Sequence, residues 1–271
     1  MKGLADPSRK DTPRLHDELA ALRDAIEAAP TARMLISSEE FFSAPPERIR
    51  NLADALPTDD VIIVAYVRSP DSYLLSLYAQ MVRHPDNDFA MDLSTFIAKA
   101  LAEGTQIDFL NAMTAWRDVF GADRILLRCY EEGDTVETLS AIVGVETSRL
   151  RRKARSNRSI SRDAGEVVRA AKRMGLETDA RWRVFRAATA RFPATTHSGY
   201  HLDARTRNAI LHSVRPQMDM LFASFDRPNP YRHQPDQILH DISRVTDAEP
   251  ETIRYAQLVE EFLQAPNPAS L

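Results

Sequence analysis

The strongest hydrophobic pattern in the chain is the run of seven apolar residues from Val61 to Val67, most of them β-branched. Continuous apolar runs of this length are typical of strands that are buried on both faces, as in parallel sheets covered by helices. After the turn that begins at Ser69, apolar residues return at helical spacing as far as Arg83, and Pro70 suits a first helical turn. The pattern therefore predicts a buried strand that leads directly into a helix.

Two polar residues in this stretch indicate a binding site. Ligands of parallel sheets lie beyond the C-terminal ends of the strands, which is where Arg68 stands, and Ser76 follows about two helical turns later. A guanidinium group, a hydroxyl group and the free N–H groups of a helix start together suit a phosphate or a sulfate. The alternative for Arg68 is an ion pair with a surface carboxylate.

The same reasoning assigns the other segments. We expect two more strands, a short one within 33–42 and another at 124–130, and a helical, basic character after residue 149. We expect helices at 12–29, 46–56, 93–103, 107–120, 135–143, 161–174, 181–191, 203–225 with an interruption or a bend at Pro216, and 250–263. Alternating strands and helices predict an α/β fold with parallel strands. We divide the chain into a disordered lead-in (1–11), an α/β domain (12–225), and a Pro-rich linker with a helical tail (226–271).

Composition and charge narrow the class of protein. The 271 residues are 44% hydrophobic and 27% charged, which is ordinary for a globular protein, and the net charge of −4 gives no general reason to expect nucleic acid. Between Arg149 and Arg191, however, fourteen Arg and Lys accompany four Asp and Glu. This basic region favours either an anionic ligand or a solvated helical surface. Its few aromatic residues and the lack of a docking motif argue against nucleic acid.

Cysteine content and the N-terminus predict the compartment. Cys129 is the only cysteine, so neither an intramolecular disulfide nor a cysteine-based metal site can form, and a reducing compartment is expected. The N-terminal residues lack the apolar core of a signal peptide, and no apolar run approaches the roughly 18 residues of a membrane span. We therefore expect a soluble, cytoplasmic protein that requires no metal.

Several motifs now stand in a recognisable order: Ser37-Ser38-Glu39 after an apolar stretch, Arg68-Ser-Pro with Ser76 after the central strand, WRDVFG before ILLRCYEE, and Asn157 before a helix. This order resembles the bacterial branch of the sulfotransferase family, whose sulfuryl donor is 3′-phosphoadenosine 5′-phosphosulfate (PAPS). The resemblance covers roughly residues 34–225. Its most specific element is the spacing of Arg68 and Ser76 after a buried strand.

The resemblance implies a P-loop NTPase-like parallel sheet flanked by helices, with a largely helical C-terminal half. It implies that Arg68 and Ser76 bind the 3′-phosphate of PAPS or of its product PAP, and that Tyr130 lies beside the adenine. Asn157 would lie near a second nucleotide-binding loop. Glu39 would take the proton of an acceptor hydroxyl on a carbohydrate or a small metabolite. From the residues alone, Glu39 equally suits the start of a helix capped by Ser38.

One departure from the family limits this interpretation. A glycine-rich phosphate loop should precede Glu39, yet residues 1–38 contain a single glycine, Gly3. The sheet is therefore expected to be truncated at its N-terminus, either because the chain is a fragment or because the protein has lost donor activation. We expect weak catalysis at best from these residues. A missing strand would also leave a sheet edge that a second copy of the chain, in a homo-oligomer, would cover.

Three functions remain open at this point. The first is a sulfotransferase, and the second is a catalytically impaired relative that binds a nucleotide, an anionic glycan or a protein. The third is a nucleotide or phosphoryl-transfer enzyme that shares only the fold. The sequence does not name the acceptor either, because acceptor pockets in such folds are built by variable loops.

Overall fold

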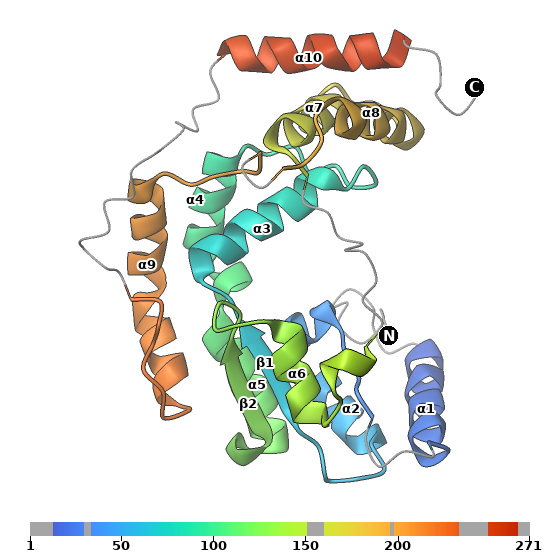
Figure 1. Ribbon diagram of the computed structural model, residues 1–271, viewed down its shortest axis with the longest axis vertical. Coiled ribbons are helices and arrows are strands. Elements are labelled where there is room, and N and C mark those ends of the chain that lie inside the picture. The colour runs from blue at the N-terminus through green and yellow to red at the C-terminus, as the bar shows by residue number, and fades with distance from the viewer. Residues whose placement is uncertain (1–12, 30–33, 151–159, 196–197, 233–248, 265–271) are drawn as a thin grey trace. The chain divides into compact units, whose positions relative to one another are not determined.

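A computed structural model describes residues 13–29, 34–150, 160–195, 198–232 and 249–264 (Figure 1). The chain forms two compact units, each assembled from segments that are distant in the sequence. The first, which we call the sheet unit, comprises Met1–Ser69, Asp108–Arg151 and Arg215–Tyr231. The second, the helical unit, comprises Pro70–Ile107, Arg152–Val214 and Arg232–Leu271.

The sheet unit combines two strands with short helices. In chain order its elements are α1 (Pro13–Glu27), the 3-10 helix η1 (Glu39–Ser43), α2 (Pro46–Ala55), β1 (Ile63–Val67), α5 (Phe109–Phe120), η3 (Ala122–Arg124), β2 (Ile125–Cys129), α6 (Thr135–Val143) and η4 (Thr147–Arg149). The C-terminal part of α9 (Ala204–Ala223) also belongs to this unit. The predicted α/β class is confirmed, and the described part of the chain is mostly helical.

β1 and β2 lie side by side and are parallel, with Ile63 opposite Ile125 and Val67 opposite Cys129 (Figure 1). The prediction that the strand at Val61–Val67 is buried on both faces is wrong for most of β1. Only Val67 is buried in β1, and the preceding Ile62 is 46% exposed. The physical reason is that the sheet has two strands in the described part of the chain, so few neighbours cover β1.

The strand predicted within 33–42 does not form in its described part. Residues 34–38 have no regular secondary structure, and Met34 and Leu35 are 44% and 54% exposed. Because nothing buries these side chains, their apolar character does not stabilise a strand. The chain next turns into η1, where the indole N–H of Trp116 donates a hydrogen bond to the Phe41 carbonyl over 3.1 Å.

The helical unit contains α3 (Pro70–Arg83), α4 (Leu93–Glu103), η2 (Thr105–Ile107), α7 (Arg162–Arg173), α8 (Thr178–Arg191), the N-terminal part of α9, and α10 (Glu249–Gln264). Every predicted helix of the chain is present, with bounds that differ from the prediction by three residues at most. Pro216 lies inside α9 and does not end it.

The core of the helical unit is aromatic at its centre. Tyr78 of α3 is fully buried, and the rings of Phe89, Phe96 and Tyr200 lie 5.0–5.8 Å from its ring. Helix α7 is buried from Ala164 to Lys172, including three charged residues. The basic region is therefore not simply a solvated surface, because part of its charge is used inside the fold.

Two expectations remain, which concern membrane-spanning helices and the predicted domain boundaries. None of the described helices is both long and apolar enough to cross a bilayer. The predicted lead-in, residues 1–11, lies outside the described residues, and the predicted boundary at residue 225 stays a prediction.

Candidate functional site

The carboxyl ends of both strands meet at one edge of the sheet. Val67 and Cys129 are the last paired residues, and the Tyr130 N–H donates a further hydrogen bond to the Val67 carbonyl over 2.8 Å. Arg68 and Tyr130 are therefore neighbours at this edge, as two parallel strands require. In open α/β sheets this is the edge at which ligands bind.

Arg68 lies over the face of Tyr130, with its guanidinium carbon 5.1 Å from the ring centroid. The Tyr130 side chain is 47% exposed, so its ring remains accessible. The Nε atom of Arg68 is buried and has no hydrogen-bond partner. Among the described residues no carboxylate pairs with Arg68, which argues against the surface ion pair that was its alternative interpretation.

Glu131 joins the end of β2 to two other segments. Its Oε1 accepts a hydrogen bond from the backbone N–H of Ser69 over 3.0 Å. Its Oε2 lies 2.6 Å from the hydroxyl of Tyr231, which also contacts the Val67 carbonyl over 2.9 Å. The carboxylate of Glu131 is thus already hydrogen-bonded to the backbone N–H of the residue that directly follows Arg68.

Residues 226–231, which we call the strap, are fixed against the same edge. Arg227 binds both carboxylate oxygens of Glu132, over 2.8 and 3.0 Å, and donates to the Leu127 carbonyl over 2.8 Å. The buried Asn229 accepts a hydrogen bond from the Tyr231 N–H over 2.9 Å. These contacts hold Tyr231 over the ends of both strands.

Burial and neighbouring charges shift three groups at this edge. Burial and the contact with Glu131 raise the pKa of Tyr231, so its hydroxyl stays protonated at neutral pH. Burial raises the pKa of Cys129, which keeps this thiol neutral and a poor nucleophile. Burial opposes ionisation of Glu132 as well, but the hydrogen bonds from Arg227 and Cys129 and the charge of Arg227 together outweigh it, and the pKa of Glu132 is lowered.

The remaining predicted site residues lie apart from this edge or are not described. Ser76 is exposed on α3 in the helical unit, and its pairing with Arg68 in the sheet unit stays a prediction. Glu39 is the first residue of η1, and residues 34–38 before it form no strand. Asn157 lies outside the described residues.

Sequence reasoning missed Glu131, Glu132, Arg227 and Tyr231 as members of this site. The acidic pair directly follows Tyr130 at the end of a predicted strand, which was an available signal. Arg227 and Tyr231 lie in the segment predicted to be a Pro-rich linker, and no local pattern indicates what it contacts. Their contacts with Glu132 and Glu131, which follow β2, span 95 residues or more.

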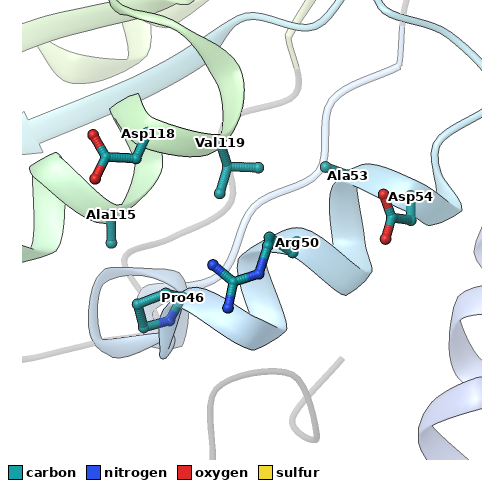
Figure 2. A pocket seen from close by; sticks show the side chains of 7 residues that line it. All are labelled: Pro46, Arg50, Ala53, Asp54, Ala115, Asp118 and Val119. Atoms are coloured by element: carbon teal, nitrogen blue, oxygen red, sulfur yellow. The ribbon is translucent and has the colours of Figure 1, made fainter.

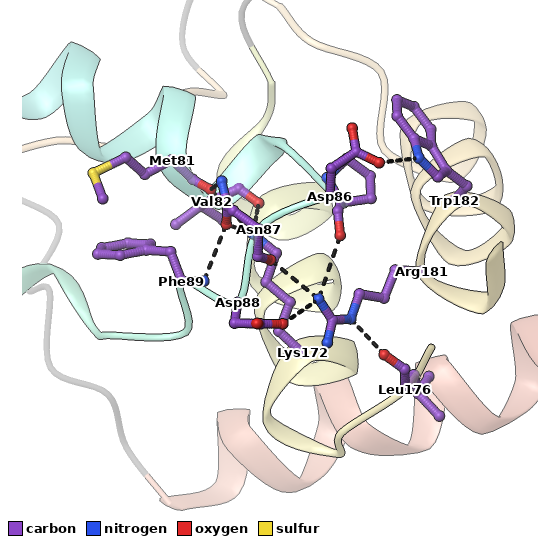
Figure 3. Close-up of polar contacts among 11 residues, drawn as sticks. Met81, Val82, Asp86, Asn87, Asp88, Phe89, Lys172, Leu176, Arg181 and Trp182 are labelled. Atoms are coloured by element: carbon purple, nitrogen blue, oxygen red, sulfur yellow. Dashed lines mark hydrogen bonds and ion pairs between the residues drawn. The ribbon is translucent and has the colours of Figure 1, made fainter. Parts of the chain in front are cut away.

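Two other features of the molecule are distinct from this edge. A pocket of about 340 Å³ lies between α2 and α5, lined by Pro46, Arg50, Ala53, Asp54, Ala115, Asp118 and Val119 (Figure 2). None of these residues is a predicted site residue. In the helical unit, Lys172 and Arg181 hold the connection between α3 and α4, residues 84–92, through a group of polar contacts (Figure 3).

The residues at the carboxyl edge fit one part of the implied nucleotide. A buried guanidinium nitrogen without a partner suits a phosphate oxygen, and an exposed aromatic face suits a base. No protein-family model, no curated protein and no solved structure matches this chain.

Proposed function

We propose that this chain is a sulfotransferase-like protein that binds PAPS or PAP at the carboxyl edge of its sheet. Arg68 binds the 3′-phosphate in this proposal, and the Tyr130 ring stacks against the adenine. The observation that carries it is the placement of Arg68 over the exposed ring of Tyr130, with a buried Nε atom that has no partner.

The chemistry of these two groups supports a nucleotide over a simple anion. A guanidinium group binds phosphate through charge-assisted hydrogen bonds, which are about twice as strong as neutral ones. An aromatic face stacks on a base with a gain of about 1–3 kcal/mol. An inorganic phosphate uses only the first interaction, whereas an adenosine phosphate uses both.

The proposed reaction is transfer of a sulfuryl group, which PAPS supplies when bound, to a hydroxyl group of a carbohydrate or a small metabolite. An alcohol is a weak nucleophile at neutral pH, so a base must take its proton during the transfer. Glu39 is the candidate for this base from the family resemblance, and its role stays a prediction.

A second candidate function is nucleotide binding without catalysis. Residues 34–38, which directly precede Glu39, form no strand and contain no glycine. They therefore offer no phosphate loop to the sulfuryl end of the donor, and losing one preorganised donor costs about 10²–10³-fold in rate. Transfer from radiolabelled PAPS to a panel of hydroxyl acceptors separates the enzyme from the binding protein.

Calorimetric titration with PAP tests the binding proposal. The wild-type protein should bind PAP, and Arg68→Ala should weaken binding at least tenfold. Arg173→Ala is the matched control, because Arg173 is an exposed arginine of α7 and is not one of the residues assigned to the proposed site. Absence of PAP binding, or equal affinities for wild type and Arg68→Ala, would rule the proposal out.

A further inference from the structure

Glu131 is an anion that the protein itself places at the proposed phosphate site. Its carboxylate accepts the N–H of Ser69, and Ser69 directly follows Arg68 in the chain. In a strand-to-helix connection of a parallel sheet, this backbone amide is a group that a bound phosphate would use. The amide is therefore already engaged when no ligand is bound.

The charge of Glu131 also opposes a second anion. A phosphate on Arg68 would stand beside the carboxylate that holds Ser69, and like charges at short range repel each other. Glu131 does not pair with Arg68, since the described contacts of its carboxylate are with Ser69 and Tyr231. The charge of Arg68 therefore remains available to a ligand, whereas the backbone N–H of Ser69 is already hydrogen-bonded to Glu131.

Displacing Glu131 would also affect the strap. The Oε2 atom of Glu131 lies 2.6 Å from the Tyr231 hydroxyl, and Tyr231 is the last residue of the strap. If the carboxylate moves away, this hydroxyl loses its contact with Oε2 and keeps its contact with the Val67 carbonyl. Movement of Glu131 is thus coupled to the attachment of the strap at the carboxyl edge.

We propose that Glu131 is a built-in competitor of the nucleotide phosphate, which a ligand must displace from Ser69 and which thereby couples ligand binding to release of Tyr231. This inference rests on the proposed function, because it concerns the same site. It assigns to Glu131 the regulation of affinity, a role distinct from direct binding of the nucleotide.

Glu131→Gln is a test that preserves the contacts. The glutamine oxygen still accepts the Ser69 N–H, and its NH₂ group donates to the Tyr231 oxygen, while the Tyr231 hydroxyl donates to the Val67 carbonyl. The change therefore removes the negative charge but leaves every donor with an acceptor. Glu137→Gln removes the same charge at an exposed position of α6 and serves as the control.

The experiment is calorimetric titration of PAP into wild type, Glu131→Gln, Glu137→Gln and Arg68→Ala. We expect Glu131→Gln to bind PAP about tenfold more tightly than wild type, and Glu137→Gln to bind like wild type. If Arg68→Ala loses binding but Glu131→Gln does not gain affinity, the competitor role is overturned and the proposed function stands. If neither wild type nor Glu131→Gln binds PAP, both proposals are overturned.

Discussion

The guanidinium group of Arg68 lies over the ring of Tyr130, 5.1 Å from its centroid, although the two residues are far apart in the sequence. The parallel pairing of β1 and β2 produces this contact, because Val67 and Cys129 stand opposite each other at the end of the ladder. One edge of a short sheet thus brings together a cation and an accessible aromatic face. The proposed nucleotide site depends on this relationship.

The attachment of the strap gives a first prediction. Tyr231→Phe removes the hydroxyl that contacts both Val67 and Glu131 but keeps the ring against Phe222, 5.9 Å away. We expect faster amide hydrogen exchange in residues 226–231 and a loss of about 1 kcal/mol in unfolding free energy. Tyr66→Phe, which removes a 3.4 Å contact with Thr135, is the control and should leave strap exchange unchanged. Unchanged exchange in Tyr231→Phe would show that the hydroxyl does not hold the strap.

Lys172 gives a prediction about pH. Its ammonium group is buried and donates to the carbonyls of Met81 and Val82 over 3.0 Å, and to the Asn87 side chain over 2.8 Å (Figure 3). Burial lowers the pKa of Lys172 to about 8, with nearby Arg181 adding to the shift and Asp88 opposing it. Above pH 8 the folded protein has therefore released a proton that the unfolded chain still binds.

Unfolding free energy should consequently rise with pH in this window. We expect wild type to gain on the order of 1 kcal/mol relative to Lys172→Met between about pH 8 and 10.5. At pH 7 the variant should be less stable by about 1–3 kcal/mol, because the carbonyls at the end of α3 lose their donor. Urea unfolding of both proteins at a series of pH values measures this. Parallel curves for the two proteins would contradict the assignment.

Asp92 gives a prediction about pH in the acid range. It caps α4 by accepting the Thr95 N–H over 2.8 Å. Burial raises its pKa, but hydrogen bonds from Ser94 and Thr95 outweigh burial and lower the pKa of Asp92 to about 2, from an ordinary value of 3.8. Its stabilising effect is therefore present above pH 3.8 and is lost as the pH falls towards 2.

Asp92→Ala should cost about 1 kcal/mol at pH 7, and this cost should shrink on acidification. Asp92→Asn keeps a capping oxygen without the charge and should lose less stability, with little pH dependence. Thermal unfolding at pH 7 and at pH 3 distinguishes the three proteins. A cost that does not depend on pH would contradict the role of the ionised carboxylate.

Gly165 gives a prediction about packing in α7. A Cβ atom at this position would overlap the hydroxyl group of Tyr200, which donates a hydrogen bond to the buried Glu166 over 3.0 Å. We expect Gly165→Ala to lower the unfolding free energy by about 1–3 kcal/mol, although alanine favours helices. Gly199→Ala is the control, since a Cβ atom there meets nothing within 4 Å. Equal melting temperatures for the two variants would contradict this packing.

The helices were predictable from the sequence because their ends are encoded locally. Asp92 and Gly104 enclose α4, and Asp134 and Gly144 enclose α6, and both helices have the predicted bounds. The cap at each start and the left-handed glycine at each end depend only on neighbouring residues. Such signals do not require knowledge of the tertiary structure.

Strand burial and the strap were not predictable in the same way. The apolar run of β1 predicted burial on both faces, but burial depends on which elements cover a sheet, and Ile62 is exposed. Arg68 was predicted from the end of a strand and Tyr130 from the family resemblance, whereas the contact of Tyr231 with Glu131 joins residues 100 apart. The hydrophobic periodicity of a sequence does not indicate a contact between residues so far apart along the chain.

The most direct test of the proposed site is a double-mutant cycle on PAP binding with Arg68→Ala, Tyr130→Ala and the combined variant. If the two residues form one site, each single change should weaken PAP binding about tenfold or more, and the combined change should weaken it less than the product of the two. Inorganic phosphate should respond to Arg68→Ala much more than to Tyr130→Ala. Wild-type affinity for PAP in Arg68→Ala, measured by the same calorimetric titration, would contradict the central claim.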